Sequence, residues 1–210
     1  MREIVVSLIV SYMIGSISFA FFVGKLFKGI DIRDYGSGNL GATNATRVLG
    51  LQYGGGIFFL DACKGALAAY LGIKMAHGFV YLPILCGLAA ILGHCTPFYL
   101  NFKGGKGVAT GAGLLFMLMP WVCASVFAIW VVTLLLSGRV SLASVLAAAA
   151  VPVLIILFHE PFYLLLFGMA GAIFVIYKHK SNIKRLFKGT EAKADTWGFI
   201  CKIFKGGSKK

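Results

Sequence analysis

The chain has 210 residues, of which 59% are hydrophobic, and its formal net charge at pH 7 is +13. A mean hydropathy of +0.88 excludes an ordinary soluble globular domain and indicates an integral membrane protein. Most of the positive charge is accounted for if basic residues gather in cytoplasmic loops and in a tail that lies on anionic lipid.

The apolar runs of the chain predict an all-α fold of membrane-spanning helices. A helix needs roughly 20 apolar residues to cross the hydrocarbon, although shorter helices do so in bundles. The first run is too long for a signal-peptide core and other runs follow it, so we take it as a membrane helix. The run over 107–137 is divided at Met119 and Pro120, because proline lacks the helix donor and disfavours helix in the residue before it. We therefore expect seven transmembrane helices, at 4–24, 53–73, 79–98, 107–119, 120–137, 141–158 and 161–177.

The positions of Lys and Arg predict which side of the membrane each loop faces, because these residues concentrate in cytoplasmic loops. Ten of the 20 basic residues follow Tyr177, which places the C-terminus in the cytoplasm. With seven helices, the loops 25–52 and 99–106 also face the cytoplasm, and the N-terminus lies outside. An undivided fourth helix would put both basic loops outside. We expect a membrane domain over 1–191 and a basic cytoplasmic tail over 192–210, the tail being either interfacial or disordered.

The first cytoplasmic loop contains the segment GSGNLGATNATRVLG at 36–50, which has several glycines and polar side chains and no acid. Glycines let backbone N–H groups turn toward one point and form a concave anion site. An arginine can add a bidentate contact to phosphate. The alternative is a flexible loop with ordinary turn residues. The candidate binding residues of this segment are Ser37, Asn39, Gly41, Thr43, Asn44 and Arg47.

A second cluster, HCTPFYLNFKGGKGVATGAG at 94–113, joins the third and fourth expected helices. A glycine turn that leads into a helix combines free N–H groups with the positive end of the helix dipole, which is a recurring way to bind phosphate. The Walker A pattern is absent, so the segment does not indicate ATP. The alternative is a short basic loop that serves only topology. The candidate residues are His94, Lys103, Gly104, Gly105, Lys106 and Gly107.

A third basic segment, KHKSNIKRLFKGTE at 178–191, follows the last expected helix. His179 and Asn182 are three residues apart, so they share one face if the helix continues. The alternative is a solvated basic helix end. Ser141 and Ser144 lie at the start of the sixth helix on the same cytoplasmic side, where they cap that helix or contact a substrate.

Two charged residues, Asp61 and Lys64, lie within the second expected helix. Charge inside a membrane is costly and is usually paired or functional. The spacing of three residues fits a buried structural ion pair and a direct role in the site equally well.

These patterns predict a helix bundle whose cytoplasmic side binds phosphate-bearing molecules. An enzyme of lipid metabolism and a transporter of phosphorylated metabolites both fit. A transporter would carry polar groups along a path through the membrane, whereas here they gather on one side. A CDP-alcohol phosphotransferase would need a DGxxAR-type acidic motif, which is absent. With seven acids in the whole chain no divalent-metal cage is apparent, and we expect no metal and no other cofactor.

The three basic segments, together with DACKG at 61–65, resemble the bacterial acyl-phosphate-dependent glycerol-3-phosphate acyltransferases, the PlsY family. The resemblance covers about residues 4 to 191. It implies transfer of a fatty acyl group from acyl phosphate to the 1-position hydroxyl of glycerol 3-phosphate, which gives lysophosphatidic acid and inorganic phosphate. This is the first acylation of phospholipid synthesis in the bacterial inner membrane. None of the four histidines begins an HxxxxD motif, so the machinery of acyltransferases that use acyl-CoA or acyl carrier protein is missing.

The resemblance also implies roles for individual residues. The residues expected to be catalytic are Ser37, Arg47, Lys106, His179 and Asn182. Those expected to bind substrate are Asn39, Gly41, Thr43, Asn44, Lys64, His94, Lys103, Gly104, Gly105, Gly107, Ser141 and Ser144. Glu191 is expected to anchor the third segment.

Acyl phosphate is a mixed anhydride with a good leaving group, so positioning and charge stabilisation suffice and we expect no covalent acyl-enzyme. The acceptor of the hydroxyl proton stays open between His94, His179 and a phosphate oxygen of the donor, and we favour the substrate. The expected partners are acyl phosphate, glycerol 3-phosphate and membrane lipid, with no nucleic acid. The tail over 192–210 is a candidate contact for the soluble enzyme that makes acyl phosphate.

Overall fold

A computed structural model describes residues 1–194 of the chain, and within that range every regular element is a helix. The chain divides into two compact units, one over Met1–Cys123 and one that begins at Ala124, which are described separately below. The predicted tail over 192–210 lies almost entirely outside the described residues. The elements are α1 Arg2–Ser16, α2 Phe19–Lys28, η1 Ile32–Asp34, α3 Ala42–Leu49, α4 Leu51–Lys74, α5 Leu82–Cys95, η2 Phe98–Leu100, α6 Val108–Leu118, α7 Pro120–Ser137, α8 Val140–Leu157, α9 Phe162–Lys178 and α10 Lys180–Phe187.

The prediction of an all-helical membrane protein is confirmed. Within residues 1–194, five helical stretches are long and apolar enough to cross a membrane, and α9 with α10 makes a sixth if the pair, bent by 61°, is one span. The remaining apolar helix, α6, has 11 residues. It is therefore about 16 Å long, roughly half of the hydrocarbon thickness. Seven complete crossings and the orientation of the termini remain predictions.

The division at Met119 and Pro120 is confirmed. Helix α6 ends at Leu118 and α7 begins at Pro120, and Met119 lies between them with non-helical angles of −143° and 72°. Proline is well suited to the first position of a helix, where a backbone N–H would have no partner within the helix.

The first unit is held together by close contacts between small residues. Helix α4 packs against α5 and α6, and α1 packs against α5. A Cβ placed on Gly65 of α4 would overlap the carbonyl oxygen of Thr110 in α6, and one on Gly113 of α6 would overlap that of Ala62 in α4. Such contacts let helix backbones approach closely in a bilayer, where lipid gives no hydrophobic drive for association.

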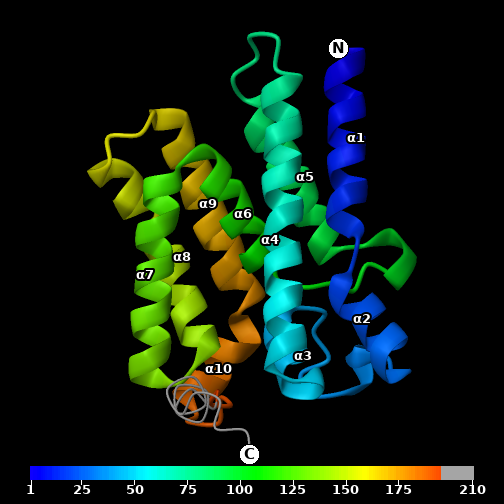
Figure 1. Cartoon of the computed structure of the whole chain (residues 1–210). Helices are drawn as coiled ribbons and strands as arrows, with labels where there is room; N and C mark the ends of the chain where they lie inside the picture. The colour runs from blue at the N-terminus through cyan, green and yellow to red at the C-terminus, as the bar shows by residue number, and fades with distance from the viewer. Residues whose placement is uncertain (195–210) are drawn as a thin grey trace, which may run out of the picture. The chain divides into compact units, whose positions relative to one another are not determined.

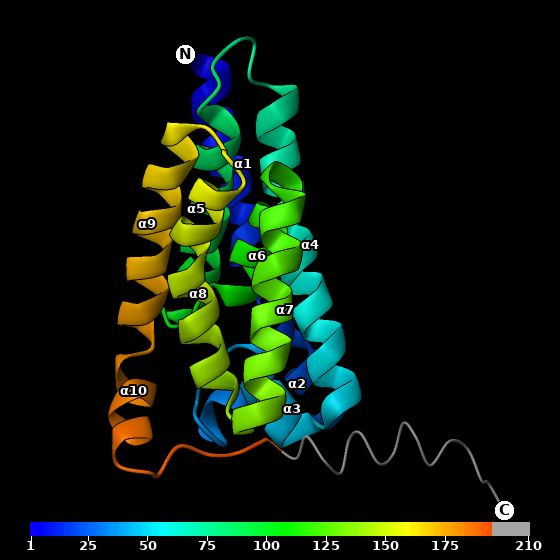
Figure 2. The same cartoon turned by 90° about the vertical axis from the view of Figure 1, so that its left-hand side faces the viewer.

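Helices α2 and α3 gather at the end of α4 where Leu51 lies (Figure 1). They cover an apolar cluster that supports the first basic segment. Its buried members are Ala20, Ile32, Leu40, Ala45, Leu49, Ile57 and Leu100. In the second unit α8 and α9 lie side by side, and α10 continues from the end of α9 (Figure 2).

Candidate functional site

The segment 36–50 forms a loop and helix α3, and the buried side chain of Asn44 fixes its shape. Oδ1 of Asn44 accepts a hydrogen bond from the backbone N–H of Ser37 at 2.8 Å. Its Nδ2 donates to the carbonyl oxygens of Ile32 and Tyr35, at 3.2 and 3.1 Å. Both N–H groups of the amide are used, so none remains for a phosphate. This corrects the prediction that Asn44 binds substrate, and its role here is to hold the loop.

Ser37 lies on an exposed part of that loop, between two glycines whose backbone conformation would be strained for any other residue. Gly36 and Gly38 have φ angles of 61° and 67°, in the left-handed region that other residues rarely adopt. Arg47 is exposed near the end of α3, and within residues 1–194 it makes no ion pair. Both side chains are therefore accessible on one rigid loop and helix. The other predicted residues of this segment, Asn39, Gly41 and Thr43, are half-buried.

The glycine loop at 103–107 folds back onto the end of α5. The N–H of Gly104 donates to the carbonyl oxygen of Cys95 at 3.2 Å, and that of Gly105 donates to the carbonyl oxygen of His94 at 3.0 Å. These two N–H groups cannot also bind an anion, which corrects the expectation that the glycine turn itself supplies the donors. The N–H groups at the start of α6 have no partner within the helix and remain for that role. Lys103 is exposed and Lys106 is half-buried beside them.

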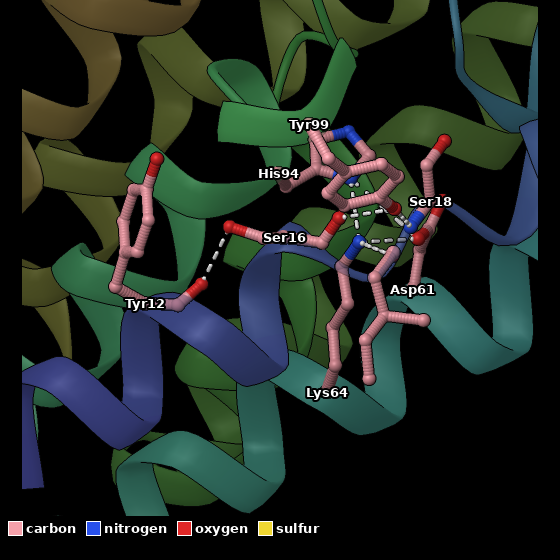
Figure 3. Close-up of polar contacts among 8 residues, drawn as sticks. Tyr12, Ser16, Ser18, Asp61, Lys64, His94 and Tyr99 are labelled. Atoms are coloured by element: carbon pink, nitrogen blue, oxygen red, sulfur yellow. Dashed lines mark hydrogen bonds and ion pairs between the residues drawn. The ribbon is translucent and has the colours of Figure 1, made fainter. Parts of the chain in front are cut away.

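Asp61, Lys64 and His94 form one buried cluster inside the first unit (Figure 3). Nζ of Lys64 lies 2.7 Å from Oδ1 of Asp61, 2.9 Å from the carbonyl oxygen of Ile17 and 2.8 Å from Nδ1 of His94. The contact with Asp61 is an ion pair, and those with Ile17 and His94 are hydrogen bonds. The side chain of Lys64 is 3% exposed. These contacts and this burial favour the structural alternative for Lys64 over a contact with substrate.

The cluster also explains why the first membrane span is broken. The chain leaves helical geometry at Ile17 and Ser18, which frees backbone groups that must be paired inside a membrane. The hydroxyl of Tyr99 donates to the carbonyl oxygen of Ser16 at 2.9 Å and accepts from the N–H of Ser18 at 3.0 Å (Figure 3). The carbonyl oxygen of Ile17, between these two residues, accepts a hydrogen bond from Nζ of Lys64. Side chains from α4 and η2 thus supply hydrogen-bond partners for the backbone groups that the break frees.

In the second unit Glu191 anchors the third basic segment, as predicted. Its Oε1 accepts from Nδ2 of Asn182 and its Oε2 accepts from Nε of Arg185, both at 2.7 Å. Asn182 and Glu191 are buried, and so is His179, whose Nδ1 lies 2.8 Å from the carbonyl oxygen of Val175. A carbonyl oxygen only accepts, so Nδ1 carries the proton and any transfer by this ring uses Nε2.

The two predicted serines of the second unit lie buried at the start of α8. The hydroxyl of Ser144 donates to the carbonyl oxygen of Val140 at 2.9 Å and accepts from Nε1 of Trp130 at 3.2 Å. Its single proton is used inside the helix, so the structure favours a structural role over the predicted contact with substrate. Ser141 remains a candidate.

Loss of charge at Glu191 is expected to loosen the third segment. Burial alone would raise the pKa of this carboxyl, but hydrogen bonds, the first of them from Asn182, outweigh burial and lower the pKa below its ordinary value of 4.5. The stabilisation is therefore complete above pH 4.5 and is lost as the pH falls through the lowered pKa. We expect Glu191→Gln to lower the free energy of unfolding at neutral pH by roughly 1–3 kcal/mol, measured by thermal unfolding in detergent.

The difference between Glu191→Gln and the wild type should shrink in acid. The exposed carboxyl of Glu3 supplies the control, because Glu3→Gln should leave stability unchanged. Equal losses from both substitutions, or a loss at Glu191 that does not shrink as the pH falls below 4.5, would contradict the anchoring role.

The first unit therefore contains the predicted residues from Ser37 to Gly107, and the second unit contains the serines of α8, His179 and Asn182. Sequence reasoning identified Asp61 and Lys64 as a pair but missed that His94 and the broken span belong to the same cluster. Within residues 1–194, no three His, Cys, Asp or Glu side chains are grouped as ligands of a metal ion would be.

Comparison with known proteins assigns the family. The family model described as glycerol-3-phosphate acyltransferase matches residues 5–189. A glycerol-3-phosphate acyltransferase of Fusobacterium nucleatum is 42% identical over 186 residues, which cover 89% of this chain and 95% of the relative. Glycerol-3-phosphate acyltransferase 2 of Bacillus anthracis is 45% identical over 189 residues, which cover 90% of this chain and 98% of the relative.

Two solved structures are also similar to this chain. The crystal structure of PlsY, an integral membrane glycerol 3-phosphate acyltransferase, in its glycerol 3-phosphate form matches with a TM-score of 0.87 and 38% identity, covering 95% of this chain and 99% of PlsY. The lysophosphatidic acid form matches with a TM-score of 0.83, covering 90% and 94%. The chain therefore belongs to the glycerol-3-phosphate acyltransferase family of integral membrane proteins that PlsY represents.

Proposed function

We propose that this protein transfers a fatty acyl group from acyl phosphate to the 1-position hydroxyl of glycerol 3-phosphate and releases lysophosphatidic acid and inorganic phosphate. The observation that carries the proposal is the match along nearly the whole chain to PlsY in its glycerol 3-phosphate form. The missing HxxxxD motif supports acyl phosphate as the donor over acyl-CoA. The basic loops support a site on the cytoplasmic face of the bacterial inner membrane.

In the proposed reaction the hydroxyl oxygen attacks the acyl carbon, and the bond from that carbon to the phosphate oxygen breaks. Phosphate leaves with the bonding electrons, and the hydroxyl proton moves to a phosphate oxygen of the donor. Negative charge is present on both reactants throughout. Arg47 and Lys106 supply positive charge, and the start of α6 supplies N–H donors. Ser37 contributes a hydroxyl on a fixed loop, as a ligand of phosphate and not as a nucleophile.

The test of this function is release of inorganic phosphate by purified protein that is given palmitoyl phosphate, with and without glycerol 3-phosphate. We expect release that requires both substrates and does not occur with palmitoyl-CoA. Intact-protein mass measured during turnover should show no added acyl group. An acyl adduct would overturn direct transfer, and absence of any release by folded protein would overturn the acyltransferase assignment.

Neither buried histidine is expected to act as the general base. Nδ1 of His94 lies 2.8 Å from the ammonium of Lys64, so this ring is not available as a base. Of the two histidines, only His179 could accept the hydroxyl proton, and it would do so at Nε2. Loss of an essential base costs roughly 10²-fold or more in rate. We expect His94→Ala and His179→Ala to keep kcat within about tenfold of wild type at saturating substrate, because the donor phosphate accepts the proton. A loss of about 10²-fold in kcat for His179→Ala, without loss of folded protein, would assign the base to that ring.

A further inference from the structure

The glycine loop rests on the side chain of His94. Besides the hydrogen bond from Gly105 to the carbonyl oxygen of His94, the imidazole ring lies directly beneath this glycine. A Cβ on Gly105 would overlap Nε2 of the ring and lie 2.7 and 2.9 Å from its Cε1 and Cδ2. Gly104 is confined differently, because its Cβ would meet the backbone of His94 and Cys95 and the ring of Pro97. The position of the loop at Gly105 is thus limited by the side chain of His94, whereas at Gly104 it is limited by the backbone of His94 and Cys95 and by the ring of Pro97.

The opposite edge of the ring is held by Lys64, and this contact fixes where the ring carries its proton. Nζ of Lys64 is paired with the carboxylate of Asp61 and is therefore an ammonium, which can only donate. Nδ1 of His94 lies 2.8 Å from this ammonium and 3.5 Å from Oδ1 of Asp61, and the shorter contact requires that it accept. In the neutral ring the proton then lies on Nε2, on the edge that faces Gly105. A salt bridge inside the membrane thus determines the tautomer of a residue beneath the glycine loop.

We propose that Asp61 and Lys64 are positioning residues for glycerol 3-phosphate binding, which act through the ring of His94 on the loop 103–107. This inference rests on the proposed function. Lys64 is 3% exposed and its Nζ is held by Asp61, Ile17 and His94, so it does not contact substrate and its influence passes through the ring. The loop leads directly into the start of α6, whose first N–H groups have no hydrogen-bond partner within the helix. A tilt of the ring displaces this start, and a misplacement of about 1 Å can cost roughly 10²-fold.

The test is whether removal of the ring rescues a bulky residue at position 105. Gly105→Ala is expected to raise the KM for glycerol 3-phosphate by roughly 10- to 100-fold, because its methyl group overlaps the ring. In a His94→Ala background the methyl group has room, so Gly105→Ala should cause no further increase. Gly104→Ala is the matched control. Its methyl group meets backbone and Pro97, so it should raise the KM more than it lowers kcat and should do so equally with and without the ring.

A second pair of variants tests the proton on Nε2. Gln can accept from Lys64 with its oxygen and donate toward the loop with its amide nitrogen, whereas Leu can do neither. His94→Gln should therefore retain a lower KM for glycerol 3-phosphate than His94→Leu, with similar KM for palmitoyl phosphate in both. In ¹⁵N-histidine spectra, the signals that disappear in His94→Gln should be those of an Nε2–H ring. An Nδ1–H ring would overturn the proposal.

Two further outcomes separate this inference from the proposed function. If the wild type turns over but Gly105→Ala is equally harmful with and without the ring, the positioning role is wrong and the acyltransferase assignment stands. If the wild type releases no phosphate, binding of glycerol 3-phosphate is measured by calorimetry without the donor, and the same dependence on the ring is expected in Kd. Asp61→Asn should raise the KM or Kd for glycerol 3-phosphate alone. A purely structural role would instead reduce the yield of folded protein and affect both substrates equally.

Discussion

Arg47→Ala is expected to lower kcat/KM for glycerol 3-phosphate by roughly 10²–10³-fold, the range seen when one preorganised charge-stabilising group is lost. The guanidinium is exposed on α3 and, within residues 1–194, makes no ion pair, so the fold does not depend on it. Both substrates carry phosphate, and the fork of an arginine matches that group with two hydrogen bonds. Arg47→Lys keeps the charge but not the fork, and it should recover only part of the loss.

The segment between α2 and α3 offers a matched control in Arg33. This arginine donates to Asp31 at 2.7 Å and lies over the ring of Phe21 at 5.5 Å, so its charge is already used. A partly exposed pair of this kind contributes about 0–1 kcal/mol. Arg33→Ala should therefore leave kcat/KM within a few-fold of wild type, measured as phosphate release from palmitoyl phosphate. Equal losses from the two alanine variants would show that Arg47 acts only on folding or on general charge.

Sequence patterns predicted the features of this fold that depend on neighbouring residues. The apolar runs indicated helices, and Pro120 divided the longest run, because both signals lie within one continuous stretch of the sequence. The break at Ile17 and Ser18 was not predicted. Its backbone groups are satisfied by Lys64 and Tyr99, which lie 47 and 81 residues further along the chain. The residues of the run over 4–24 give no indication of partners so distant in sequence.

The candidate site shows the same limit for side chains. Composition identified Asn44 and Ser144 as polar residues in basic, glycine-containing surroundings, but not what they bond to. Asn44 uses its amide on the backbone of Ile32 and Ser37, which depends on how the loop folds, and Ser144 donates its hydroxyl to Val140 one turn earlier in α8, a bond that composition alone does not specify. By contrast, the anchoring by Glu191 was predicted from the third motif, and its bonds to Asn182 and Arg185 confirm it.

Lys64→Met is expected to produce the largest loss of stability, because Asp61, which is 1% exposed, loses its nearest positive partner and keeps only Nδ1 of His94, 3.5 Å from its Oδ1. Breaking a buried ion pair by removing one partner costs roughly 3–5 kcal/mol. For a chain of this size that corresponds to a decrease in Tm of roughly 6–20 °C, measured by thermal unfolding in detergent. Lys74→Met is the control on the same helix, since Lys74 is exposed and its Nζ lies over the ring of Tyr70, 5.4 Å from the ring centre.

The double variant Asp61→Asn with Lys64→Met separates charge from hydrogen bonding. It removes both charges, so the penalty for an isolated carboxylate disappears, and a neutral pair of similar volume is often tolerated in place of a buried ion pair. The carbonyl oxygen of Ile17 and Nδ1 of His94 still lose their donor, and each such loss costs about 1–3 kcal/mol. The double variant should therefore be more stable than Lys64→Met and less stable than wild type. If it is no more stable than Lys64→Met, Lys64 stabilises the protein through its hydrogen bond to the backbone at the break and not by neutralising the charge of Asp61.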